Sequence, residues 1–299
     1  MKRKNIAILA FVAVLSGPMF IPTVQAAAES ALSVFRVSYA KTITISVTDI
    51  QSIADYAKKT EAAMKNEKIE ETKSKGLENH QKAVDIKSIL NPLKDPKNFT
   101  AFSITLPHIN TDTPKLYSID SYSKTFTLNT ANINAELTKI KAKPISNSFN
   151  NTKITISTPP VAIAEYPDFT LIETQGVYVN APDNVIDSLW KHFATLPMIP
   201  TDLSSQLLAI DPTSREVYLP VIKGFGHETN LGTTNGYIYS AKDLAQVAAM
   251  VPDLATANEV AELENDNGSA LIWTRNGILY ILAGIKSDSE LSYIARNID

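Results

Sequence analysis

Residues 270–282 of this chain read ALIWTRNGILYIL, and this stretch is the most informative part of the sequence. Two apolar runs flank Asn276-Gly277, a pair that tolerates the positive φ angles of a type I′ turn. Because the twist of that turn matches the twist of paired strands, the stretch predicts an antiparallel hairpin. Ser287 and Glu290 follow with the spacing of a capping box, which predicts a helix after the hairpin. The apolar stripe of that helix comprises Leu291, Ile294, Ala295 and Ile298.

The plan of a strand, a polar capping residue and a helix recurs three times before the hairpin. The recurring strands are residues 42–47, 125–128 and 237–240, and each is followed by apolar positions at helical spacing. In the first unit, Ser46 or Thr48 is the expected helix cap. Descent from a duplicated unit and the general frequency of this plan explain the recurrence equally well. Antiparallel sheets with helices packed on one face predict an α+β fold, whereas a doubly wound α/β sheet would need longer helical crossovers.

Other elements are less regular. The remaining predicted strands are 99–106, 153–157 and 216–222, together with 170–173 and 177–179, which form a strand pair or one bulged strand. Asp183 is the expected cap of a helix carrying Trp190, and residues 203–210 form a second short helix. We divide the chain into a leading segment (1–26), an N-terminal α+β region (27–150) with a charged connector (58–97), and a C-terminal α+β domain (151–299).

The start of the chain has the pattern of an export signal. Lys2, Arg3 and Lys4 precede residues 6–24, which contain no charged side chain, and Val24-Gln25-Ala26 offers small residues where a signal peptidase cleaves. The alternative is an uncleaved anchor, because these nineteen residues would extend about 28 Å as a helix, enough for a thin hydrocarbon core. Both interpretations place the rest of the chain outside the cytoplasm, because the basic end stays inside.

The composition excludes several classes of protein. Hydrophobic residues make up 44% and charged residues 20%, which is typical of a folded protein and not of a disordered or collagen-like chain. Without the basic residues of the export signal, 25 basic residues stand against 31 acidic ones, which disfavours binding to nucleic acid. The absence of cysteine excludes thiol nucleophiles, disulfides, cysteine zinc sites and a lipid-modified cysteine. The four histidines are too far apart in sequence to form a local metal-binding pair.

Catalytic motifs have little support. The SxxK pattern occurs at Ser38–Lys41 and at Ser121–Lys124, but its SDN and KTG companions are absent. The sequence also lacks a G-x-S-x-G elbow, a P-loop and a G-x-G-x-x-G run. Residues 263–274, aligned on Gly268, lack the acidic ligands that a calcium loop needs at its two ends. We therefore predict no catalytic, cofactor-binding or metal-binding residues.

Residues 224–228, GFGHE, are the run most similar to a functional site. Glycines let the backbone approach a ligand, and a neighbouring histidine and glutamate are suited to acid–base work. We favour a surface loop instead, between the strand ending at Ile222 and the strand starting at Tyr237. We also expect Trp190 and Trp273 in the core, and His192 on a solvated helix face.

Three stretches resemble a known family. They are Phe35-Arg36-Val37 with the strand and cap that follow it (42–50), residues 173–179 (ETQGVYV), and residues 270–298. Together they are similar to an uncharacterised extracytoplasmic domain family of Gram-positive bacteria, which often forms the outer part of membrane-bound anti-sigma-factor-like proteins. The resemblance implies a non-catalytic sensing or binding module. Such regulators carry a cytoplasmic domain before the membrane helix, whereas here only Met1–Asn5 would lie inside, so we do not expect this chain to hold a sigma factor itself.

The sequence therefore predicts a non-catalytic binding or sensing module of the bacterial cell envelope, either secreted or anchored through residues 6–24. Its expected partner is a membrane or envelope protein, with no nucleic acid and no cofactor. Two alternatives remain. One is an extracytoplasmic hydrolase that uses His227, Glu228 or dispersed carboxylates, because a spatially assembled site leaves no local motif. The other is a carrier that holds an apolar ligand between sheet and helix.

Overall fold

The computed structural model describes residues 40–53, 55–56, 90–108, 112–176, 178–212, 217–250 and 267–298. The predicted export signal, Arg36, most of the charged connector, and residues 263–266 of the stretch that was compared with a calcium loop lie outside the described residues. Within the described ranges, no helix has the length and apolar character needed to cross a bilayer. The predicted α+β class is confirmed, including the antiparallel sheets and the C-terminal hairpin with its helix.

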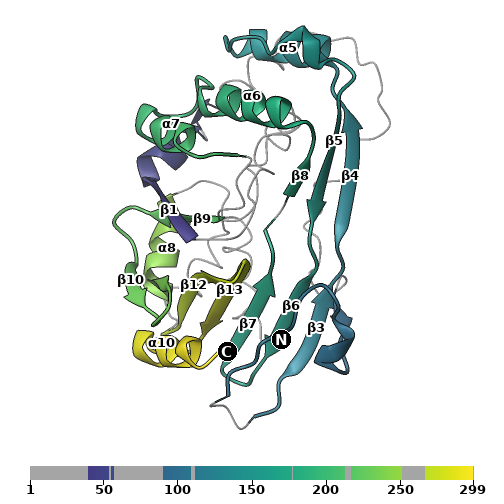
Figure 1. Cartoon of the computed structure of the whole chain (residues 1–299). Coiled ribbons are helices and arrows are strands. Elements are labelled where there is room, and N and C mark those ends of the chain that lie inside the picture. Colours follow the sequence, from purple (N-terminus) through teal and green to yellow (C-terminus); the bar gives the residue numbers. More distant parts are fainter. Residues whose placement is uncertain are drawn as a thin grey trace.

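The larger sheet of the described chain has eight strands in the order β10-β11-β12-β13-β7-β6-β3-β2, all paired antiparallel (Figure 1). In that order the strands span His227–Asn230, Asn235–Ser240, Ser269–Arg275, Ile278–Gly284, Phe169–Thr174, Val161–Glu165, Lys115–Ile119 and Asn91–Pro92. The predicted hairpin is β12–β13, with Arg275 opposite Ile278. Its turn has positive φ at Asn276 (51°) and Gly277 (78°), the conformation of a type I′ turn.

Two helices cover opposite faces of this sheet. Helix α8 (Ala241–Met250) packs its apolar stripe on a core that contains Ala270 and Ile272 of β12. Helix α10 (Asp288–Arg296) packs on a core that contains Leu271 and Trp273 of the same strand. Because successive side chains of a strand point to opposite faces, the two helices lie on different sides of the sheet and not on a single face as expected. The long apolar run of β12 is the reason, since it offers both faces a buried surface.

A smaller antiparallel sheet has the order β4-β5-β8, with strands Tyr122–Thr127, Lys153–Thr158 and Tyr178–Asn180. These strands continue β3, β6 and β7 of the larger sheet in an unbroken register. Ile119 pairs with Val161 and Tyr122 pairs with Thr158, so two residues intervene on each strand. The break falls at Pro159-Pro160, where proline supplies no N–H to the ladder. We call this assembly the split ribbon, with a lower half (β3, β6, β7) and an upper half (β4, β5, β8) (Figure 1).

The split ribbon revises one prediction. Residues 170–173 and 177–179 were expected to form a strand pair or one bulged strand. Instead β7 and β8 pair with different partners, β6 and β5. Thr174 lies opposite Val161 and Tyr178 lies opposite Ser157, so three residues intervene on each strand and no residue is inserted. The interruption follows the break in the neighbouring strand rather than a bulge.

Helices and a small parallel pair complete the fold around the upper half. Strands β1 (Ala40–Ile45) and β9 (Val217–Ile222) pair in parallel, and helices α5 (Thr130–Lys139), α6 (Asp183–Ala194) and α7 (Thr201–Leu208) share one core with β1 and the upper half. Trp190 is buried there as expected, and its Nε1 donates to the Leu207 carbonyl at 2.8 Å. Ser46 caps the helix that starts at residue 47, because its Oγ accepts from the Asp49 amide at 3.0 Å.

Three local predictions are wrong. Residues 99–106 form no strand. They follow a short 3-10 helix (Pro96–Asn98) and lie over the α10 face of the larger sheet, where Phe102 and Leu106 contact the core. Asp183 is the first residue of α6 and not its cap, because Pro182 occupies the capping position without a side-chain bond. His192 is half-buried instead of solvated, and burial lowers its pKa.

Candidate functional site

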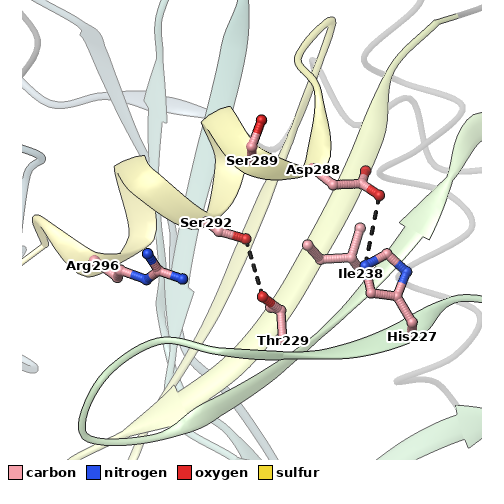
Figure 2. Close-up of a pocket in the computed structure, with 7 residues that line it drawn as sticks. All are labelled: His227, Thr229, Ile238, Asp288, Ser289, Ser292 and Arg296. Atoms are coloured by element: carbon pink, nitrogen blue, oxygen red, sulfur yellow. Dashed lines mark hydrogen bonds and ion pairs between the residues drawn. The ribbon is translucent and has the colours of Figure 1, made fainter.

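A small recess lies at the edge of the larger sheet, between strand β10 and helix α10 (Figure 2). Its volume is about 280 Å³, close to the lower limit for pockets that bind small molecules. Six of the seven residues that line it are polar or charged: the lining consists of His227, Thr229, Ile238, Asp288, Ser289, Ser292 and Arg296. The recess therefore offers hydrogen-bonding groups and charges, and Ile238 is the one apolar residue among those that line it.

The glycines of the GFGHE run shape the turn that leads into β10. Gly224 and Gly226 both have positive φ, at 88° and 64°. A Cβ at Gly226 would collide with the Ile238 carbonyl, so the close packing of this turn on β11 requires glycine. The expected surface loop is therefore a tight turn followed by an edge strand. The positive φ angles and the close packing of this turn account for both glycines.

The structure separates the two acid–base candidates of that run. His227 and Glu228 are consecutive on an extended strand, so their side chains point to opposite faces. His227 faces α10, where its Nε2 lies 3.7 Å from Oδ2 of Asp288 (Figure 2). On the other face, Glu228 Oε1 accepts a hydrogen bond from the side-chain Nδ2 of Asn235 at 2.6 Å. A shared acid–base role for His227 and Glu228 has no geometric support.

Hydrogen bonds hold the carboxylate and one hydroxyl of the recess. Asp288 Oδ1 accepts from Ser269 Oγ at 2.8 Å, which leaves Oδ2 facing His227. Ser292 Oγ lies 3.2 Å from Thr229 Oγ1, so helix and strand are joined directly (Figure 2). The recess thus presents groups whose positions are already fixed, an arrangement suited to recognising a polar ligand.

One end of the recess carries a cation. The Arg296 guanidinium donates from Nε and Nη2 to the Asn230 carbonyl, at 3.2 and 2.9 Å. These two bonds orient the guanidinium at the end of β10 and leave N–H groups of Nη1 and Nη2 for other acceptors. With His227 and Asp288 at the other end, the recess combines an anion-binding group with a carboxylate (Figure 2).

The hydroxyls of the recess do not approach His227 as a nucleophile would approach its base. Ser292 is bonded to Thr229, and Ser289 Oγ lies 3.2 Å from Ser287 Oγ, pointing away from His227 (Figure 2). A general base needs its nucleophile within hydrogen-bond reach. Ser289 and Ser292 are therefore not positioned as nucleophiles for His227 in this structure.

Sequence analysis missed Asp288, Ser292 and Arg296 as site residues. Their spacing of four residues places them on one helix face, which is a readable signal. It indicates only that they share a face. The register of β10 decides that this face meets His227 and Thr229, and β10 was not predicted.

A second unusual residue is the carboxyl of Glu173, on the central strand β7. Its side chain is 1% exposed, and both Oε atoms accept from the Thr105 amide at 3.1 Å. Burial raises its pKa to about 8, although the bonds from Thr105 act in the opposite direction. Glu173 is therefore mostly neutral at pH 7, unlike an ordinary glutamate.

The other residues considered from the sequence lie apart from the recess. Trp190 and Trp273 are buried core residues, as predicted. Ser121 directly precedes strand β4 and Lys124 lies within it. Ser38 lies outside the described residues. Among the side chains that the structure describes, no three His, Asp or Glu residues gather as a metal site would require.

Comparisons with protein-family models, with curated proteins and with solved structures found no match. The interpretation of the site therefore depends on its own geometry and on the sequence.

Proposed function

We propose that this chain is a non-catalytic binding or sensing module of the bacterial cell envelope, which acts outside the cytoplasm and contacts a membrane or envelope partner. The export pattern of residues 1–26 and the resemblance to an extracytoplasmic domain family support the location. The recess between β10 and α10 supports a binding role, because its polar groups are held in place by hydrogen bonds and lie on the surface.

The observation that carries the proposal is the way Asp288 and Ser292 are held. Each is bonded to a strand residue, Ser269 or Thr229, so the helix face that lines the recess is preorganised. Preorganised polar groups bind with a smaller loss of conformational entropy than mobile ones. A ligand of this recess would carry hydroxyl or charged groups that complement Asp288 and Arg296.

Photo-crosslinking in intact cells tests the proposal. A photoreactive residue replaces Ser289, which lines the recess, in the full chain as the cells produce it. The matched control carries the same residue at Ala135, an exposed position of α5 beside the smaller sheet. We expect crosslinks to an envelope component from position 289 and not from position 135, identified by mass spectrometry. Equal crosslinking from both positions, or crosslinks to cytoplasmic proteins alone, would contradict the proposal.

The hydrolase alternative now has a sharper test. If the recess were catalytic, His227 would work with Asp288, because Glu228 faces the other side of the sheet. The variants H227A and D288N are compared with E228Q for hydrolysis of envelope glycans and peptides by the purified protein. Turnover that is lost in the first two variants and retained in E228Q, with all three folded, would replace the binding role by catalysis.

A further inference from the structure

Glu173 lies in the middle of a buried row that crosses four strands of the larger sheet. Ala162 of β6, Glu173 of β7, Tyr280 of β13 and Trp273 of β12 are successive cross-strand neighbours. The rings of Trp273 and Tyr280 are stacked, with centroids 5.0 Å apart. A carboxyl group thus occupies a row that is otherwise apolar or aromatic. Water reaches almost none of it, because its side chain is 1% exposed.

Residues 99–108 cover this row, and we call them the strap. The Thr105 amide donates to both carboxyl oxygens of Glu173, and Thr105 Oγ1 lies 3.5 Å from the Tyr280 hydroxyl. The end of the strap is tied to the C-terminal residues, because Pro107 bridges to Ile298 and the His108 amide donates to the Asn297 carbonyl at 3.1 Å. Glu173 and Tyr280 are therefore the sheet residues in polar contact with Thr105, and Glu173 accepts the shorter hydrogen bonds.

We propose that the proton on Glu173 controls how often the strap lifts from the sheet. A neutral carboxyl is tolerated in this row, whereas an ionised carboxylate loses most of its hydration there and needs water. The sheet side of the site does not yield easily, because β7 is hydrogen-bonded to β6 and β13 along its length. Residues 99–106 of the strap are not part of a β-sheet. Lifting the strap therefore costs less free energy than opening the sheet at β7 to admit water.

The two tyrosines that interact with Glu173 do not change charge in the pH range in which Glu173 ionises. Tyr166 and Tyr280 both interact with it, and burial raises the pKa of both phenols, to about 12 for Tyr166. They stay neutral over the range in which Glu173 ionises. Arg275 partly offsets the rise in the pKa of Tyr280. Its guanidinium also donates to the carbonyl of Ile298, the residue to which Pro107 of the strap bridges. Glu173 is thus the group in this cluster that changes charge between acid and mildly alkaline pH.

Lifting the strap has a consequence for the recess, and this consequence depends on the proposed function. The strap is tied to Asn297 and Ile298, directly after α10 and next to Arg296. Loosening this tie would free the last turn of α10, which carries Arg296 at the border of the recess. Ligand affinity would then fall as the strap opens.

Hydrogen exchange of the strap amides tests the proposal without a ligand. The full chain, its E173Q variant and the control E228Q are compared between about pH 5 and about pH 8, after correction for intrinsic exchange rates. We expect protection of the Thr105 amide to fall about tenfold per pH unit in the native protein and in E228Q. In E173Q, which cannot ionise, protection should be high and constant. Constant protection in the native protein, or an unchanged pH dependence in E173Q, would overturn the proposal.

A direct titration keeps the proposal testable if E173Q does not fold. The carboxyl carbon of Glu173 is followed by NMR in the native full chain, together with the Thr105 amide resonance. We expect both signals to titrate together, well above the range of an ordinary glutamate. Titration of Glu173 in that ordinary range, or a Thr105 signal that ignores it, would refute the role of the proton. Neither measurement involves a ligand. A negative result would therefore refute the role of the Glu173 proton without bearing on the proposed binding function.

Discussion

The two halves of the split ribbon are made by the same three chain segments in the same register, yet they are buried differently. One face buries apolar residues in both halves, with Ala164 and Leu171 in the lower half and Ile154 and Val179 in the upper half, and Glu173 is a buried polar residue on this same face. The other face is apolar only below the break, where Ile163 and Ile172 share a core with α8. Above the break this face carries Ser123, Thr125, Thr155 and Tyr178.

The sequence already contains this difference. Residues 153–158 alternate as KITIST, whereas residues 161–164 after the two prolines read VAIA without alternation. Alternation indicates a strand with one solvated face, and a continuous apolar run indicates burial on both faces. A strand can therefore pass from one buried face to two along its length without a change of register. The condition is that its hydrophobic pattern changes from alternating to continuous at the same point.

The largest expected effect concerns Glu173, the polar residue of the doubly buried half. Its pKa is about 8 in the folded protein and ordinary in the unfolded chain, so the folded state binds the proton more tightly. The free energy of unfolding should therefore fall as pH rises from about 4.5 to about 8, by roughly 4 kcal/mol, and level off above that. Urea unfolding at a series of pH values measures this.

The E173Q variant isolates that contribution, because glutamine does not ionise. The difference in stability between native protein and variant should shift in favour of the variant as pH rises through this window. A stability difference that is independent of pH would show that Glu173 titrates normally. Water would then reach the lower half of the ribbon at this position.

The next largest effect compares a side chain from each half. Leu171 of β7 is 0% exposed, and the L171A variant should lose about 3 kcal/mol through lost burial and the cavity left behind. Tyr178 of β8 is 46% exposed on the open face, and Y178A should lose less than about 1 kcal/mol. Urea unfolding of both variants gives the two values. Similar losses would mean that the open face is covered in solution.

A smaller effect separates the helices that cover the two halves. Helix α10 over the lower half begins with a full capping box, in which Ser287 and Glu290 bond reciprocally. Helix α5 beside the upper half has no reciprocal pair: the Asn132 amide donates to the Asn129 side chain, and the Thr130 amide donates to Asn150 Oδ1. We expect S287A to lose about 1 kcal/mol and N129A somewhat less. Thermal unfolding measures both, and a larger loss for N129A would reverse this order.

The smallest effect lies on the open face of the upper half. The hydroxyls of Thr125 and Thr155 lie 2.8 Å apart on paired strands and face solvent. A double-mutant cycle with T125V and T155V should give a coupling energy of about 0.5 kcal/mol, because water competes for both hydroxyls. Coupling well above 1 kcal/mol would indicate that this face is shielded, which would remove the contrast between the halves.

Local sequence signals were sufficient to predict the structure wherever neighbouring residues determine the conformation or the burial of a side chain. The turn at Asn276-Gly277, the cap formed by Ser287 and Glu290, and the burial of Trp190 and Trp273 all follow from neighbouring residues. The candidate site was only partly accessible. His227 was singled out, but its expected neighbour Glu228 points away, and Asp288 is brought to it from sixty-one positions along the chain.

The class of fold, the C-terminal hairpin and its capped helix can be predicted from the sequence alone, because turn preference, capping and periodicity act over a few residues. Only the tertiary structure decided which helix covers which face, how β7 and β8 divide between two sheets, and that Glu173 meets the strap. Those outcomes depend on contacts between distant segments, where packing and loss of water decide among arrangements that local preferences leave equal.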